Sequence, residues 1–364
     1  MKILILQDFL RNGGTERQSC LLANAFSEAG HAVALLTFRP GGALEAMPSP
    51  RVERLVLQSR DRGWDWFAPR LTRTAQTCGP DVILCMGRMA NCYGERLAVA
   101  IPEARVIATV RTGKPLPWLF RRSLRRAAHV VANSEESRRI LVSVHGIAEV
   151  RTSVIHNALV FPPETTEAPA TGATGHAPRL RVDPGENGFV MLCVGMFRPE
   201  KNQRELIEMA NLLPREVSWQ LWFAGEGATR VECEQFVERL GLSERIRFFG
   251  FQENPSDLYR AADLAVLAST SESLSNFLIE AHAHGLPSVS YEVTGVYECG
   301  GIVVPRGDRK GFLAQVRRFI ADRPALEAES RRVATHALEH FSPQRQTAAY
   351  LDLFARLCLP APSP

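Results

Sequence analysis

The sequence lacks the marks of several protein classes. Its eight cysteines include no C-x-x-C pair and no cluster with histidine at zinc spacing, so we expect reduced and mostly packed thiols rather than a zinc site or a disulfide framework. No apolar run approaches the roughly 18 residues that span a bilayer. The first apolar run meets Asp8 too early for a signal peptide. We therefore expect a cytoplasmic protein, and leave open a peripheral location on the inner face of the membrane.

Extreme composition is also absent. Of the 364 residues 45% are hydrophobic and 23% charged, which excludes a largely disordered chain. The length exceeds what one core usually organises, so we expect two domains. The net charge is only +4, but residues 1–165 hold 22 Lys and Arg against 14 Asp and Glu. This excess suggests an anionic partner for the first half.

Apolar runs typical of buried parallel strands recur along the chain, with helical patterns between several of them. They occupy 2–7, 31–38, 81–86, 104–110, 129–134 and 152–157, and then 189–195, 218–225, 245–250, 263–269, 287–292 and 301–305. Residues 161–188 are rich in Pro, Gly and Thr and have no apolar period, as in a linker. We predict an α/β protein with an N-terminal domain (1–165), a linker (166–188), a C-terminal domain (189–342) and a last helix (343–364) packing back towards the N-terminal domain.

Two glycine-containing loops follow predicted strands, where ligands of open α/β sheets bind. In NGGTE (12–16), Gly13 and Gly14 precede a helix that Thr15 is able to cap, although a plain tight turn explains the pattern equally well. In VGMFRPEKN (194–202), Gly195 ends a strand, and Arg198 and Lys201 flank a helix start. Two cations at such a point can hold a diphosphate, although a solvated charged turn has the same composition.

A third loop, 268–287, joins a strand to a helix and carries Glu272 and Glu280 eight positions apart. Ser273, Ser275 and Asn276 can cap the helix or donate to a ligand. The carboxylates can accept hydrogen bonds from sugar hydroxyls, while a capped surface helix is the alternative. His282 and His284 diverge on a helix, so we interpret them as structural.

These segments together carry a family resemblance. Glu272-SLSNFLI-Glu280 matches an E-x7-E motif and is followed by AHAHGLPSV. VIHNA (154–158), FAGEG (223–227), RIRFFGF (245–251), LYRAADLAVL (258–267) and GIVVPRGD (301–308) stand in the corresponding order. The chain resembles the retaining glycosyltransferases of family 4, whose GT-B fold has two Rossmann-like, doubly wound domains facing across a cleft.

The resemblance implies a role for each matching residue. Arg198, Lys201 and Glu272 would be catalytic. The donor site would comprise Gly13, Gly14, Gly195, Arg198, Lys201, Gly225, Phe251, Glu272, Leu274, Ser275, Asn276 and Glu280. Within it Glu280 would bind ribose, Glu272 the transferred sugar, and Phe251 the base. No nucleophile is evident, and the resemblance implies that the leaving diphosphate itself assists the incoming hydroxyl. No D-x-D pair is present either, so we expect no metal ion and no cofactor beyond the nucleotide-sugar co-substrate.

Two positions depart from the family pattern. Met196 stands where many relatives have arginine, and Arg198 is expected to take over that role. Arg111 stands where relatives often have a sugar-contacting histidine, so it is a candidate for binding an acidic group of the donor or the acceptor. The segment 117–131 places Trp118 beside Arg121, Arg122, Arg125 and Arg126, which suits an anionic membrane or a lipid-diphosphate acceptor and equally a solvated face.

The sequence thus predicts a retaining hexosyltransferase. It would move a sugar from a nucleotide-sugar, UDP favoured over GDP, to a hydroxyl of a glycan or lipid-linked acceptor in envelope polysaccharide or lipopolysaccharide synthesis. The alternatives are a sugar-nucleotide epimerase of the same fold and a non-catalytic nucleotide-sugar binder. No nucleic-acid-binding module is recognisable, so nucleic acid is not an expected partner.

Overall fold

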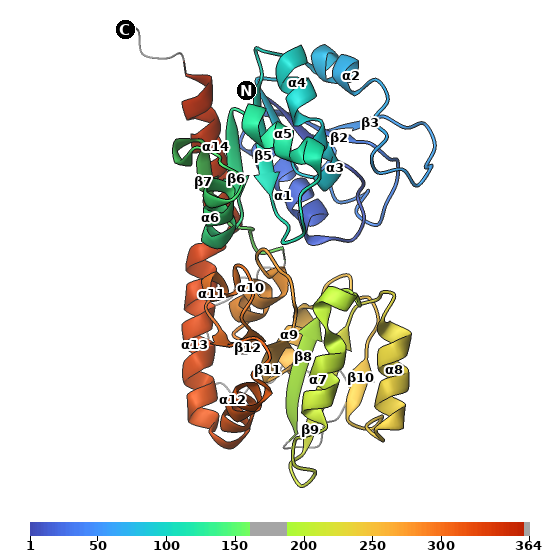
Figure 1. Ribbon diagram of the computed structural model, residues 1–364, viewed down its shortest axis with the longest axis vertical. Coiled ribbons are helices and arrows are strands. Elements are labelled where there is room, and N and C mark those ends of the chain that lie inside the picture. Colours follow the sequence, from blue (N-terminus) through green and yellow to red (C-terminus); the bar gives the residue numbers. More distant parts are fainter. Residues whose placement is uncertain (161–187, 360–364) are drawn as a thin grey trace. The chain divides into compact units, whose positions relative to one another are not determined.

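The chain folds into two compact units (Figure 1). The computed structural model describes residues 1–160 and 188–359. The N-terminal unit contains Met1–Val160 together with the C-terminal segment from Pro343, and the C-terminal unit ends at Ser342. The predicted linker, 166–188, lies outside the described residues except for its last position.

The N-terminal unit is built on a parallel sheet of seven strands. Its strands are β1 (Lys2–Gln7), β2 (Ala32–Thr37), β3 (Glu53–Val56), β4 (Val82–Cys85), β5 (Arg105–Val110), β6 (His129–Ala132) and β7 (Thr152–Val154). They lie in the order β3-β2-β1-β4-β5-β6-β7. Most central strand positions are buried and apolar, because helices cover both faces of the sheet.

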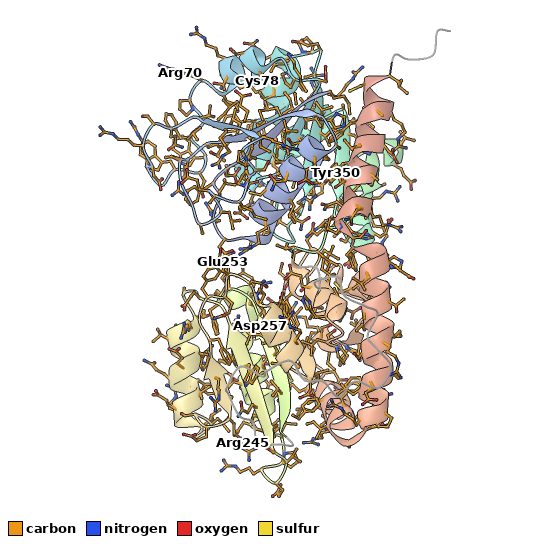
Figure 2. All side chains as sticks on the ribbon, turned by 180° about the vertical axis from the view of Figure 1, so that it is seen from behind. Arg70, Cys78, Arg245, Glu253, Asp257 and Tyr350 are labelled. Carbon is orange, nitrogen blue, oxygen red and sulfur yellow. The ribbon has the colours of Figure 1, made fainter. Side chains whose placement is uncertain are left out.

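Those helices are α1 (Gly14–Glu28), α2 (Leu71–Cys78), α3 (Arg88–Cys92), α4 (Gly94–Ala100), α5 (Trp118–Arg126), α6 (Glu135–Ser143) and α14 (Pro343–Cys358), with a 3-10 turn η1 (Glu149–Arg151). The C-terminal helix α14 belongs to this unit although it ends the chain. Its Tyr350 (labelled in Figure 2) and Phe354 pack edge-on against Phe26 of α1. These rings join the apolar cluster on one sheet face.

The C-terminal unit contains a second parallel sheet. Its strands are β8 (Phe189–Val194), β9 (Trp219–Ala224), β10 (Ile246–Phe248), β11 (Leu264–Leu267), β12 (Ser288–Tyr291) and β13 (Ile302–Val304), in the order β10-β9-β8-β11-β12-β13. Its helices are η2 (Pro199–Lys201), α7 (Gln203–Ala210), α8 (Arg230–Arg239), α9 (Ser256–Ala261), α10 (Asn276–Ala283), α11 (Val296–Cys299), α12 (Arg309–Ala321) and α13 (Arg323–His340).

Both sheets reverse their strand order at one point. The first reversal lies between β1 and β4 and the second between β8 and β11. This is the doubly wound topology, and the predicted α/β class is confirmed. In such sheets the crevice at the carboxyl ends of the two strands flanking the reversal is where ligands bind. The topology therefore selects two places to examine.

Two local expectations were wrong. Strand β3 is missing from the predicted set, because it is a short edge strand whose sequence ERLV is half-exposed rather than continuously apolar. Thr15 does not cap α1: Gly13 occupies the N-cap position in extended conformation, and the helix already begins at Gly14. The cysteine expectation is confirmed, since all eight thiols are free and six are buried.

Candidate functional site

The loops after β8 and β11 meet at the reversal point of the C-terminal sheet. The Lys201 ammonium donates to Glu272 Oε1 at 2.6 Å. The Thr270 backbone N–H donates to the carbonyl of Glu200 at 2.8 Å. Two loops about 70 residues apart in the sequence are thus one structural unit. The structure brings together the predicted diphosphate-binding cation and the predicted sugar-binding carboxylate.

Backbone conformation explains how the 194–202 loop reaches this position. Pro199 begins the turn η2, and Asn202 in the left-handed region (φ 51°) ends it and redirects the chain into α7. Gly225, after β9, has φ 143°, and a Cβ there would lie 2.1 Å from the carbonyl oxygen of Gly195. Only glycine permits this approach, so position 225 requires glycine, whereas a Cβ at Gly195 would meet no atom within 4 Å.

The two cations of this loop differ in their surroundings. The Lys201 side chain is 27% exposed and Glu272 only 10%, so their ion pair is shielded more than a surface pair. The Arg198 guanidinium is half-buried and forms no ion pair or hydrogen bond with any residue in the described ranges 1–160 and 188–359. Arg198 therefore offers positive charge that no described side chain neutralises.

The helix α10 starts in the predicted turn. Ser275 is the N-cap residue, and its hydroxyl accepts from the Leu278 N–H at 3.4 Å, while Asn276 is the first helical residue. Gly295 fixes the turn from outside: its φ is 74°, and a Cβ there would lie 2.0 Å from the Ser273 carbonyl oxygen. The N–H groups of Leu274 and Ser275 lie just before this helix start, where helices favour anions.

Glu280 lies inside α10 and is 6% exposed. The hydroxyl of Tyr259, from α9, donates to Glu280 Oε2 at 3.0 Å. This hydrogen bond orients the carboxylate. Sequence reasoning missed Tyr259, because it lies 21 positions before Glu280 with a strand between them; the only available signal was its place in the segment LYRAADLAVL.

Phe251 stands at the same edge of the sheet, after β10. Its ring is 47% exposed, and the neighbouring Gly250 carbonyl accepts from the Gly225 N–H at 2.7 Å. An exposed aromatic ring beside a glycine turn is suited to stacking on a planar base.

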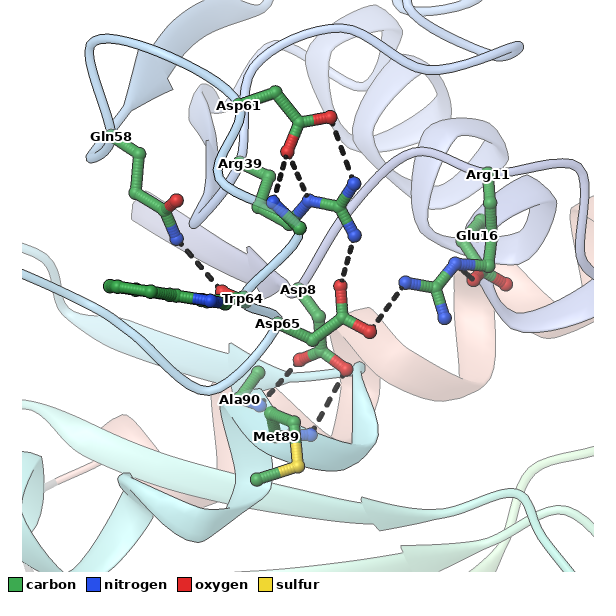
Figure 3. A network of polar contacts seen from close by, with 11 residues as sticks. Asp8, Arg11, Glu16, Arg39, Gln58, Asp61, Trp64, Asp65, Met89 and Ala90 are labelled. Carbon is green, nitrogen blue, oxygen red and sulfur yellow. Dashed lines mark hydrogen bonds and ion pairs between the residues drawn. The ribbon is translucent and has the colours of Figure 1, made fainter.

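The reversal point of the N-terminal sheet holds a buried carboxylate. Asp8, directly after β1, accepts from the N–H groups of Met89 (3.0 Å) and Ala90 (2.6 Å) at the start of α3 (Figure 3). Burial raises the pKa of Asp8 to about 6, although these two hydrogen bonds act in the opposite direction. Gly87 is required beside it, since a Cβ would lie 2.3 Å from Asp8 Oδ1.

An ion-pair network surrounds this carboxylate (Figure 3). Arg39, after β2, donates to both Asp61 and Asp65, and Arg11, after β1, also donates to Asp65. The Arg39 guanidinium lies 4.0 Å from the ring centre of Phe9. Sequence reasoning missed this network, because its members are spread over some 55 residues without a common motif.

The other predicted residues of the N-terminal unit have mixed placements. Gly13 and Gly14 form the start of α1 after β1. Arg111, after β5, donates to Asn157 and to the Tyr350 hydroxyl (2.7 Å). Its guanidinium thus ties the sheet to α14, a contact that no sequence motif indicates.

Helix α5 buries one face and exposes the predicted basic one. Phe120 is in the core, while Trp118 is exposed. Arg122 pairs with Glu95 at 2.7 Å and lies over the Trp118 ring. The side chains of Arg121, Arg125 and Arg126 are exposed and form no ion pair within the described part of the chain.

His282 and His284 have structural partners, as predicted. His282 is fully buried; its Nδ1 donates to the Cys299 carbonyl, so its Nε2 accepts from the Ser288 hydroxyl. The described residues contain no group of three or more His, Cys, Asp or Glu side chains arranged to hold a metal ion. Within the same residues no helix is long and apolar enough to cross a bilayer.

Two family models match the chain, one in each unit. Residues 12–159 match the model described as Glycosyltransferase Family 4, and residues 188–322 match Glycosyl transferases group 1. This chain belongs to glycosyltransferase family 4. The site after β8 and β11 lies within the second matched region, which also contains the E-x7-E segment from Glu272 to Glu280.

Named relatives and a solved structure agree. The chain is 30% identical over 190 residues to the lipopolysaccharide core biosynthesis glycosyltransferase LpsE of Rhizobium meliloti, covering 51% of this chain and 55% of that protein. It is 33% identical over 177 residues to LpsD of the same organism, covering 47% and 50%. The chain thus spans about half the length of these curated relatives. Anabaena HepE, solved with UDP and glucose, superposes with a TM-score of 0.79 at 21% identity over 98% of this chain and 100% of that one, which supports the GT-B fold class.

Proposed function

We propose that this protein is a hexosyltransferase that moves a sugar from a nucleotide-sugar to a hydroxyl of a glycan or lipid-linked acceptor. The observation that carries the proposal is the direct contact of Lys201 with Glu272 at the reversal point of the sheet in a family 4 chain. Relatives named for lipopolysaccharide core synthesis favour a role in envelope polysaccharide or lipopolysaccharide assembly.

In this proposal the residues act by positioning and by charge. Arg198 and Lys201 bind the diphosphate and stabilise the negative charge that builds on it as it leaves. Glu272 holds the transferred sugar, and Glu280, oriented by Tyr259, accepts hydrogen bonds from the ribose hydroxyls. These two cations supply the positive charge that a metal ion supplies elsewhere, so we propose a reaction without metal or cofactor.

The chemical step follows the retaining course. The bond between the anomeric carbon and the diphosphate oxygen breaks, and the bond to the acceptor oxygen forms on the same face of the sugar. The acceptor proton passes to an oxygen of the leaving diphosphate. This course asks the protein to hold both groups in place rather than to supply a nucleophile.

UDP is the proposed donor nucleotide, since HepE was solved with UDP and with UDP-glucose. The test is thermal unfolding with UDP-, GDP-, ADP- and CMP-sugars, for wild type and Glu280→Gln. A ligand at about 100 times its Kd adds about 2.7 kcal/mol of stability. We expect a shift with UDP-sugars that the variant loses. No shift with any donor, or an equal shift in the variant, contradicts the proposal.

We further propose that α5 places the protein on the inner face of an anionic membrane. Trp118 and four arginines of this helix are exposed, a combination suited to lipid headgroups. Flotation with phosphatidylglycerol vesicles tests this. Changing all four arginines to serine should abolish flotation, and a control with Arg215, Arg239, Arg318 and Arg331 changed should float like wild type. Equal flotation of both variants would refute the membrane role.

A further inference from the structure

The loop between β3 and α2 exposes two tryptophans. Trp64 is 44% exposed and Trp66 is 56% exposed. Their rings are stacked, with centroids 5.8 Å apart and an interplanar angle of 16°. Phe67 packs edge-on against both rings. Two large aromatic side chains thus stand at the surface in one defined arrangement.

The loop that carries them is held at several points. The buried Gln58 side chain donates to the carbonyls of Trp64 (2.9 Å) and Phe67 (2.7 Å). The Tyr93 hydroxyl donates to the carbonyl of Trp66. Every aromatic residue of the loop is therefore anchored through its own backbone. A group presented from an anchored loop loses little conformational entropy when a ligand binds.

Asp65, between the two tryptophans, anchors the loop to the sheet. Its carboxylate accepts from Arg39 (2.6 Å) and from Arg11 (2.7 Å), which follow β2 and β1. In Figure 3 the Trp64 indole extends away from these ion pairs. The loop therefore lies on the carboxyl edge of the sheet, next to Asp8 and the reversal point, where α/β proteins bind ligands.

Packing does not account for these side chains. A tryptophan that serves the core is buried, as Trp222 is in the other unit, whereas exposed aromatic groups mark interaction sites. Asp61 and Asp65 of this loop are engaged in ion pairs with Arg39 and Arg11, whereas two arginines of the loop remain near the pair. The Arg62 guanidinium lies 5.8 Å from the Trp64 ring centre, and Arg60 is exposed without an ion pair among the described residues.

We propose that Trp64 and Trp66 form a stacking surface for pyranose rings of the acceptor glycan, with Arg62 meeting acidic groups on that glycan. The proposal rests on the glycosyltransferase function above and gives its acceptor a binding site. A pyranose ring presents an apolar face of C–H groups and a rim of hydroxyls. An indole ring offers a matching apolar face, and an arginine beside it offers donors for hydroxyl, carboxylate or phosphate oxygens.

The test distinguishes glycan binding by the two tryptophans from membrane binding and from binding of the nucleotide-sugar donor. The probes are delipidated lipopolysaccharide core oligosaccharide, polygalacturonate and phosphatidylglycerol vesicles, measured by calorimetry and flotation. The proteins are wild type, the double variant Trp64→Ala/Trp66→Ala, and the matched Trp64→Phe/Trp66→Phe. Unfolding of each in the presence of a UDP-sugar is recorded separately, because the donor site lies on the other sheet.

We expect wild type to bind at least one of the two soluble glycans, the alanine pair to bind it at least tenfold more weakly, and the phenylalanine pair to fall between them. Vesicle flotation should be equal in all three. Undiminished glycan binding by the alanine pair, or no glycan binding by wild type, overturns the stacking surface. Loss of flotation by the alanine pair assigns the tryptophans to a membrane instead. In each case an intact donor-induced shift shows that the proposed function survives.

Discussion

The six strands of the C-terminal sheet have the same order as the first six of the N-terminal sheet, but the residues at the two reversal points differ in kind. In the C-terminal unit Lys201 pairs with Glu272, and the half-buried Arg198 has no ion pair among the described residues. In the N-terminal unit a buried carboxylate, Asp8, and a network of satisfied ion pairs occupy that place. The C-terminal site contains a cation, Arg198, that can bind a ligand. In the N-terminal unit the charged side chains pair with one another and hold the loops in place. A common topology thus supports binding in one unit and a rigid support in the other.

The largest effect that this comparison predicts concerns Lys201. Lys201→Met removes one positive charge from the proposed diphosphate site, and the loss of one such group typically lowers kcat by about 10²–10³. The measurement is UDP release from a UDP-sugar with acceptor present. Arg204→Met is the matched control, since Arg204 is exposed and pairs with Glu208 within α7. If both variants keep normal kcat, the reversal point of this sheet is not the reaction site.

The next effect concerns Asp8, and its sign follows from its pKa. Burial raises the pKa from 3.8 in the unfolded chain to about 6, so between pH 4 and 6 the folded state binds more protons than the unfolded one. Stability contributed by this group is therefore present below pH 4 and is lost as the pH rises through 6. A shift of this size corresponds to about 3 kcal/mol.

Asp8→Asn cannot titrate, so it isolates this contribution. The free energy of unfolding of wild type minus that of the variant should fall by about 2.4 kcal/mol between pH 4 and pH 7. Denaturant titrations at five pH values measure this free energy. Amide hydrogen exchange in β1 is the probe, so that unfolding of the N-terminal unit is reported. A difference independent of pH would show that Asp8 is an ordinary ionised carboxylate and would remove the contrast between the two units.

The sequence predicted most of the fold because buried parallel strands are nearly continuous apolar runs. Twelve of the strands were found this way, and β3 was missed because an edge strand need not be apolar. The C-terminal site was predictable for a related reason. Glu272 and Glu280 lie in one short segment, so a linear motif records their relation.

The remaining site residues do not belong to a linear motif. Asp65 depends on Arg11 and Arg39, and these partners come from different loops. Tyr259 reaches Glu280 only because the fold brings α9 and α10 together, although β11 separates them along the chain. Contacts of this kind are set by tertiary structure, and one sequence without aligned relatives does not contain them.

Tyr259 gives the smallest predicted effect and the sharpest one. Tyr259→Phe keeps the ring and removes only the hydroxyl that donates to Glu280 Oε2. A hydrogen bond to a charged group contributes about 1.5–3 kcal/mol. We expect a smaller effect on donor binding, because the other groups around the Glu280 carboxylate are unchanged in this variant. We expect KM for the nucleotide-sugar to rise about 5- to 10-fold with kcat nearly unchanged, because ribose binding precedes the chemical step. Steady-state kinetics over donor concentration measure both constants. A fall in kcat at constant KM would place Glu280 with the reacting sugar instead of the ribose, and would bring the two carboxylates of the motif into the same role.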